Sequence, residues 1–132
     1  MATNIVQFNG EIDAFNVLII TKSIAFHKKI ASKVLEGVVK RTPVLTGHAR
    51  GNWQTTVNNT TEEELETEDK DGAETIASGQ LVLAGLEPFE TIFIQNNVPY
   101  ILGLEEGTGS PKKAPEGMVA VTLAELGDFT EL

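Results

Sequence analysis

The chain has 132 residues, of which 41% are hydrophobic, and its formal net charge is −9. This composition suffices for one hydrophobic core, and no run of about 18 or more apolar residues is present for a membrane span. The lack of cysteine excludes disulfides and thiolate chemistry, and the acidic balance disfavours tight binding to nucleic-acid phosphates. We therefore expect one soluble domain over residues 1–132, with no signal peptide and no membrane contact.

The charge is distributed unevenly along the chain. Residues 11–50 contain seven Lys or Arg against three acids, whereas residues 51–132 contain three against sixteen. Such an asymmetry is most often a solvated surface, but it also suits head-to-tail contact between copies of the chain.

The first part of the chain predicts an arm followed by a long helix. Residues 1–12 fit a short edge strand or a loose arm, because two apolar residues precede Asn9-Gly10. Asp13 is a suitable N-cap for a helix over residues 14–41, which contain no proline and carry apolar residues at helical spacing: Ile19, Phe26, Ile30, Val34 and Val38. Such a helix is roughly 42 Å long. Because a domain of this size covers less than that, part of it is expected to face a partner.

The segment Thr42–Trp53 is predicted to be a compact junction. Pro43 ends the helix, and Thr46 is placed to cap the following turn. Trp53 begins a half-buried antiparallel strand over residues 53–58, in which it is expected to anchor the core. Arg50 fits two roles, either an ion-pair partner of Glu105 or Glu106, or an exposed charge at an interface.

Residues 59–74 are predicted to form a mobile acidic loop. They contain eight acids and one lysine, and Leu65 is their single large apolar residue. Because this segment has little apolar surface to bury, we expect it to be dispensable for folding. It also lacks the residue order of a calcium-binding loop. A short helix is expected over residues 75–86.

The stretch Glu90–Thr108 is predicted to organise the fold. Residues 91–94 form an apolar, β-branched run that suits a strand buried on both faces. Phe93 is expected to share one core with Trp53, and Tyr100 to be a further anchor at the start of a helical turn that Gly107 stops. A final helix is expected over residues 118–126. Together these elements predict an α+β fold: a small antiparallel sheet packed against a long N-terminal helix, with a shorter middle helix and a C-terminal helix.

The sequence contains no arrangement of residues that is typical of catalysis. His27 and His48 lack metal-ligand spacing, so they are interpreted as ordinary helix and turn residues. Glu105 and Glu106 are adjacent on a predicted helix and point in different directions, which favours a solvated or interface pair over an acid and base flanking one bond. We expect no enzyme activity, no cofactor and no metal.

Four segments, in order, resemble the signatures of a tailed-bacteriophage neck family: R-T-P-V-L-T-G-H-A-R-G-N-W (Arg41–Trp53), N-N-V-P-Y (Asn96–Tyr100), L-E-E-G-T (Leu104–Thr108) and A-P-E-G-M-V-A-V-T-L-A-E-L (Ala114–Leu126). The family comprises minor tail or tail-completion components of siphophages and related prophages, similar to the Z-type tail component of lambda. The resemblance covers residues 12–126. The chain departs from it at Leu45, where members commonly have Asp, and in a C-terminal helix shorter than that of many members.

The resemblance implies a non-catalytic structural protein of the virion, placed at the neck or tail end after assembly in the host cytoplasm. It implies self-assembly into a ring, expected to be a hexamer, which contacts adjacent neck, tail-terminator or head-closure proteins and surrounds passing DNA without binding it specifically. Together with the charge asymmetry, it indicates five candidate interface residues: Lys29, Lys33, Arg50, Glu105 and Glu106.

A small α+β ligand-binding or regulatory module without catalysis is the alternative function. A concave pocket with a buried polar group would favour that module. Flat, self-complementary faces would favour the ring.

Overall fold

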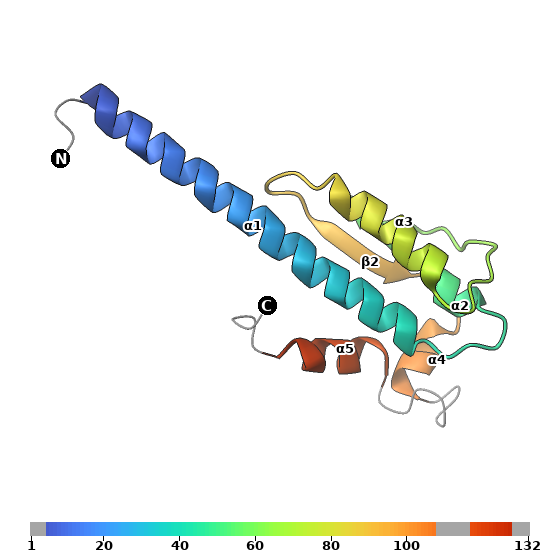
Figure 1. The fold of residues 1–132 in the computed structure, drawn as a ribbon. Coiled ribbons are helices and arrows are strands. Elements are labelled where there is room, and N and C mark those ends of the chain that lie inside the picture. The colour runs from blue at the N-terminus through green and yellow to red at the C-terminus, as the bar shows by residue number, and fades with distance from the viewer. Residues whose placement is uncertain (1–4, 108–116, 128–132) are drawn as a thin grey trace.

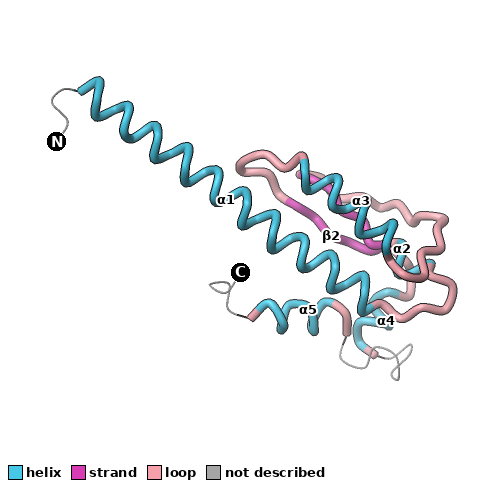
Figure 2. Tube along the Cα trace, viewed as in Figure 1, coloured by secondary structure: helices cyan, strands magenta, loops and turns pink. Residues whose placement is uncertain are grey.

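The computed structural model describes residues 5–107 and 117–127. Its elements follow in the order α1 (Ile5–Arg41), α2 (His48–Gly51), β1 (Trp53–Val57), α3 (Ala73–Ala84), β2 (Ile92–Asn96), α4 (Ile101–Glu106) and α5 (Val119–Leu126). α1 runs the length of the molecule, with α3 and the sheet on one side of its C-terminal half and α5 on the other (Figures 1 and 2). The predicted α+β fold, with a long N-terminal helix and a small antiparallel sheet, is confirmed.

The helix α1 begins earlier than the sequence predicted. Residues 5–12, expected to belong to an arm, form its first turns, while residues 1–4 lie outside the described part of the chain. No proline occurs before position 43, and a single glycine such as Gly10 costs a helix only about 1 kcal/mol. The N-terminal half of α1 extends beyond all the other elements (Figure 1).

The C-terminal half of α1 forms one wall of the core. Its buried side chains, at helical spacing, are Ala31, Leu35, Val38 and Val39. Directly after the helix, the buried Thr42 hydroxyl donates to the Val38 carbonyl oxygen (2.6 Å) and accepts from the Trp53 indole N–H (2.7 Å). Trp53 therefore has its ring in the core and its polar edge paired at the end of α1.

The sheet consists of β1 and β2, which pair antiparallel with Trp53 opposite Asn96. Because side chains alternate along a strand, Trp53 and Ile94 share the face that packs on α1, whereas Phe93 points to the other face. The expectation of a central strand buried on both faces is wrong: a sheet of two strands has only edges, and every residue of β2 is half-buried. Phe93 consequently does not share a core with Trp53.

The remaining helices pack closely on α1. A Cβ atom at Gly79 of α3 would lie 2.3 Å from Leu35 Cδ2, and one at Gly37 of α1 would lie 2.5 Å from Thr122 Cγ2 of α5. The predicted middle helix, the helical turn after Tyr100 and the C-terminal helix are confirmed as α3, α4 and α5. None of the helices in the described ranges is long and apolar enough to cross a membrane.

Candidate interaction surfaces

Arg50 fastens the end of α1 to the segment that precedes α3. Its guanidinium donates to the carbonyl oxygens of Thr42 (2.8 and 3.2 Å), Lys40 (3.1 Å) and Lys70 (2.6 Å). The last carbonyls of a helix have no partner within it, and a cation there also favours the helix dipole. The expected ion pair of Arg50 with Glu105 or Glu106 is not found among the described residues, and Arg50 is half-buried.

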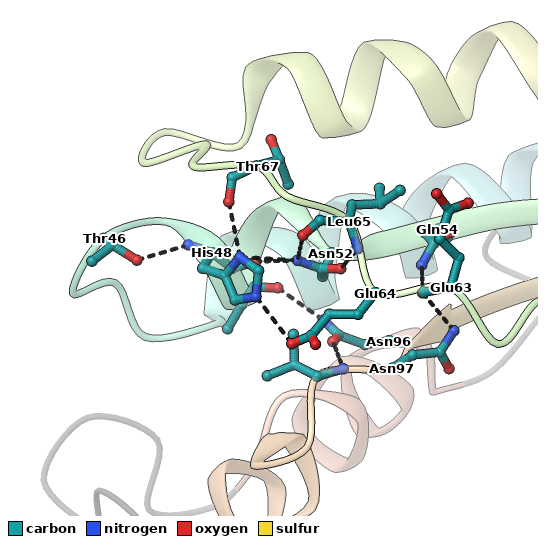
Figure 3. Close-up of polar contacts among 12 residues, drawn as sticks. Thr46, His48, Asn52, Gln54, Glu63, Glu64, Leu65, Thr67, Asn96 and Asn97 are labelled. Atoms are coloured by element: carbon teal, nitrogen blue, oxygen red, sulfur yellow. Dashed lines mark hydrogen bonds and ion pairs between the residues drawn. The ribbon is translucent and has the colours of Figure 1, made fainter.

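The acidic segment between β1 and α3 is fixed to the body of the protein; we call residues 59–72 the acidic strap. The fully buried Asn52 pairs with it as a strand would, since its Nδ2 donates to the Leu65 carbonyl oxygen (3.1 Å) and its Oδ1 accepts from the Leu65 N–H (2.7 Å). Figure 3 shows this pairing beside the contacts of His48.

Further side chains bind the backbone of the acidic strap. Three such hydrogen bonds run from Gln54 to the Glu63 carbonyl oxygen (2.7 Å) and from Asn97 to the carbonyl oxygens of Thr61 and Glu63 (2.9 Å each). The Asp69 N–H donates to the Gly47 carbonyl oxygen (3.0 Å). The expectation of a mobile loop is therefore wrong. Polar side chains of the body replace the apolar contacts that the segment lacks.

The carboxylates of the acidic strap separate into an inner one and an outer set. The inner one is Asp69, which is buried and accepts from the Gly72 N–H (3.2 Å), the Thr75 N–H (2.8 Å) and the Thr75 hydroxyl (2.6 Å) at the start of α3. Burial raises the pKa of Asp69, but the hydrogen bonds to its carboxylate, first those from Thr75, together outweigh burial, so the net pKa is lowered. The outer set is exposed: Glu62, Glu63, Glu64, Glu66, Glu68 and Asp71.

His48 holds the acidic strap with both of its ring nitrogens. Nδ1 lies 3.1 Å from the Thr67 carbonyl oxygen and Nε2 lies 3.1 Å from Glu64 Oε1 (Figure 3). Both partners are acceptors, so the doubly protonated ring makes both bonds. The hydrogen bond to Glu64, and next the one to Thr67, raise the pKa of His48. His48 is the first residue of α2, where a turn residue was expected, and it also holds the acidic strap as a latch.

The two acids of α4 have different environments. Glu105 Oε1 accepts from the N–H groups of Met118 (2.9 Å) and Val119 (2.7 Å), and Oε2 accepts from that of Ala120 (3.1 Å). It therefore caps the N-terminus of α5, where a negative charge is favourable. Glu106 is exposed. Of the predicted acidic interface pair, only Glu106 lies free of an internal structural role in the described chain.

A row of exposed lysines follows the side of α1 that faces away from the core; we call it the basic stripe, formed by Lys22, Lys29, Lys33 and Lys40. Spacings of seven and four residues place these side chains on one face of a helix. The candidate interface residues Lys29 and Lys33 thus belong to one row of lysines, in which Glu36 lies between Lys33 and Lys40.

The three expected core anchors, Trp53, Phe93 and Tyr100, differ in burial. Trp53 is 7% exposed and belongs to the buried core with Leu35 and Met118. Phe93 is half-buried on the outer face of the sheet, and Tyr100 is 50% exposed. Tyr100 precedes α4, whose Ile101 and Leu104 pack on the core in its place.

Two hollows lie on the described surface. One, of about 290 Å³, lies between β1, α3 and the acidic strap, with Trp53, Leu65 and Val82 in its walls. Thr55 Oγ1, at its edge, is buried without a hydrogen-bond partner. The other, of about 240 Å³, we call the α1–α5 groove; it is lined by Lys33, Glu36, Gly37, Lys40, Arg41, Thr122, Glu125 and Leu126.

No group of three or more His, Asp or Glu side chains in the described ranges is placed to hold a metal ion. Comparisons with protein-family models, curated proteins and solved structures find no match for this chain.

The sequence reasoning missed the polar side chains that organise the loops, above all Asn52, Asp69 and Glu105. For Asp69 a signal was present, because an Asp and a Gly shortly before a helix are typical of its N-terminus. Asn52 and Glu105 bind backbone groups 13 to 15 residues away, and no local pattern indicates such a partner.

Proposed function

We propose that the chain is a structural protein of the tailed-phage virion, a neck or tail-completion component whose copies assemble into a ring that joins tail to head. The resemblance of its four motifs supports this function. The resemblance also favours a hexamer, which contacts adjacent neck, tail-terminator or head-closure proteins and is built in the host cytoplasm.

The observation that carries the proposal is the separation of charge across the molecule. The basic stripe lies on the side of α1 opposite its buried residues Leu35 and Val38. The acidic strap is bound by Gln54 and Asn97 on the far side of the sheet. One face is thus basic and another acidic, which is the arrangement that a heterologous, head-to-tail contact between identical copies requires.

The shape of the molecule agrees with such an assembly. The N-terminal half of α1 projects past the other elements (Figure 1), and a helix of this kind gains stability when a neighbouring copy covers it. In a closed ring the surplus negative charge would border the channel and repel DNA phosphates, so that the genome slides through without binding.

A deletion tests the proposal directly. Removing the coding sequence from a phage that carries it should leave filled heads and finished tails unjoined in electron micrographs, and supplying the protein in trans should restore joining. Mass spectrometry of purified virions should detect the chain. Normal yields of joined, infectious particles without the chain would contradict the proposal.

A small-ligand module is favoured by one observation, the hollow beside Thr55 with its unpaired hydroxyl. However, Thr55 Oγ1 is enclosed, and a Cβ atom at Gly79 would lie 2.8 Å from it, so the hydroxyl faces α3. A ligand in the hollow would not reach it without movement of α3. A small molecule that raises Tm with the logarithm of its concentration above Kd would favour this alternative.

A further inference from the structure

We propose that the turn around Phe89 of one copy docks into the α1–α5 groove of a second copy. This inference rests on the proposed self-assembly and names the contact that joins neighbouring subunits.

Phe89 is presented to solvent in a costly backbone conformation. Its side chain is 95% exposed, in the turn between α3 and β2, and its φ is +65°. A left-handed conformation is unfavourable for a bulky residue and is kept only where the surrounding structure enforces it. An exposed aromatic ring held in this way is typical of a site that contacts a partner.

A network of polar contacts enforces the conformation of this turn. Glu90 Oε1 accepts from the Glu87 N–H (2.7 Å), and Oε2 accepts from Asn58 Nδ2 (3.1 Å). Asn58, which also has a positive φ, exchanges hydrogen bonds with the backbone of Thr91 (2.7 and 3.0 Å). The turn is therefore rigid, and Phe89 loses little conformational freedom when it is buried against a partner.

The α1–α5 groove has the chemistry to receive this turn. Leu126, the Thr122 methyl group and the apolar stems of Lys33, Lys40 and Arg41 provide surface for an aromatic ring. Lys33 and Lys40 are exposed at the groove, while Arg41 is held by Thr122 and Glu125. Lysine ammonium groups also attract the face of an aromatic ring.

Charge complementarity selects this groove over the hollow between β1, α3 and the acidic strap. Phe89 is flanked by Glu87, which is exposed, and Glu90. At the α1–α5 groove these acids would meet Lys33 and Lys40. These lysines outnumber Glu36 there, because Glu125 is paired with Arg41. At the other hollow they would meet Glu74 and the acidic strap, and no Lys or Arg among the described residues lines it. Like charges brought together oppose binding.

The occupant of the groove is a second copy, because α1 separates the turn from the groove within one chain. Lys28, on the α3 side of α1, donates to the Ala84 carbonyl oxygen (3.2 Å) just before the turn. Gly37, on the other side, contacts Thr122 of α5. In the proposed ring this contact is heterologous, since each copy offers a turn to one neighbour and a groove to the other.

Photo-cross-linking tests the contact without removing the aromatic ring. Phe89 is replaced by p-benzoylphenylalanine, and the labelled protein is mixed with isotope-labelled wild type, both as purified protein at high concentration and in assembled particles. Intermolecular products should map to the peptides of α1 and α5 that line the groove. Products that map to Ser78 and Val82 in the other hollow, or no intermolecular product in either setting, would overturn the inference.

Phe89→Gly separates docking from folding. Glycine tolerates the positive φ, so this variant should keep or raise Tm while self-association falls at least tenfold. Leu45→Ala is the matched control, because Leu45 is another exposed large apolar residue (85%); this variant should leave Tm and self-association unchanged. Unchanged association of Phe89→Gly would overturn the inference.

Charge reversal then tests the pairing of the turn with the groove. Glu87→Lys and Lys33→Glu should each weaken association, and the two together should restore part of it. If the chain occurs in virions at the head–tail joint but these variants behave like wild type, the docking inference fails while the proposed function stands. If the chain is absent from virions, the proposed function fails.

Discussion

Glu105 and Glu106 are adjacent on α4 but differ in structural role, and the free energy of unfolding of two variants can measure this difference. Glu105→Gln keeps the size of the side chain but removes the charge that accepts three N–H groups at the start of α5. Hydrogen bonds to a charged group contribute about 1.5 to 3 kcal/mol, so unfolding in urea should show a loss of that order. Glu106→Gln, at an exposed position, is the control and should change the free energy of unfolding by less than about 0.5 kcal/mol. Equal effects would contradict the capping role.

His48 makes the attachment of the acidic strap depend on pH. Its folded pKa lies above the unfolded value of about 6.5, so the stabilisation is complete below that unfolded value and is lost as the pH rises through the folded pKa. Raising the pH from mildly acidic to mildly alkaline should therefore lower the protection factor of the Leu65 N–H, which donates to Asn52 Oδ1, after exchange is corrected for its intrinsic rise with pH. His48→Gln should abolish this loss of protection. A wild-type protection factor that stays constant over the same range would contradict the latch.

At the scale of an element, the acidic strap is expected to stabilise the fold through its backbone. A Gly-Ser linker of equal length in place of residues 60–68 no longer holds its backbone carbonyl oxygens opposite the side chains of Asn52, Gln54 and Asn97, so their hydrogen bonds to the strap are lost. At about 1 kcal/mol for each bond, the loss should reach roughly 3 kcal/mol, and Tm should fall by about 10 °C.

The matched control keeps the strap and neutralises its outer charges, with Gln replacing Glu62, Glu63, Glu66 and Glu68. These side chains are exposed, so Tm should stay within a few degrees of wild type. If the linker variant is as stable as the control, the strap is dispensable after all.

The elements show how far a single sequence constrains this fold. All the helices but α2, and the antiparallel pair, were predictable, because Val34 and Val38 recur with helical spacing and Pro43 and Gly107 stop the helices. The position of the acidic strap was not predictable, because it depends on the hydrogen bonds of Asn52 with Leu65, and no hydrophobic pattern indicates such bonds. A count of apolar residues therefore underestimates how ordered a segment is when distant side chains bind its backbone.

The same limit applies to the candidate surfaces. Lys29 and Lys33 were predictable as exposed, since they lie opposite the apolar positions of the long helix. Arg50 and Glu105 were not predictable as structural residues, because the backbone carbonyl and N–H groups that they bind come near them only in the folded chain. Phe93 was assigned to the wrong environment, because the elements that pack on a sheet decide whether a strand has one covered face or two, and α1 covers only the face of Trp53 and Ile94.

At the scale of the whole molecule, the separated charges predict association that depends on salt. The basic stripe and the acidic strap are exposed, and charges in water are screened over about 8 Å at physiological ionic strength. Self-association measured by sedimentation, or the joining of heads to tails, should therefore weaken steadily as salt is added. A contact that depended on apolar surface alone would hold or strengthen.

A pair of charge-reversed proteins tests whether the contact is head-to-tail. One variant carries Glu in place of Lys22, Lys33 and Lys40, and the other carries Lys in place of Glu62, Glu63, Glu66 and Glu68. The first variant is acidic on both faces and the second is basic on both faces, so neither should self-associate alone. In an equal mixture, the acidic stripe of the first variant meets the basic strap of the second. At the next contact, the basic stripe of the second meets the acidic strap of the first. The mixture should recover association with alternating copies, visible by native mass spectrometry. Recovery requires that the stripe of one copy meets the strap of another, so a mixture that stays monomeric while wild type assembles would rule out this arrangement.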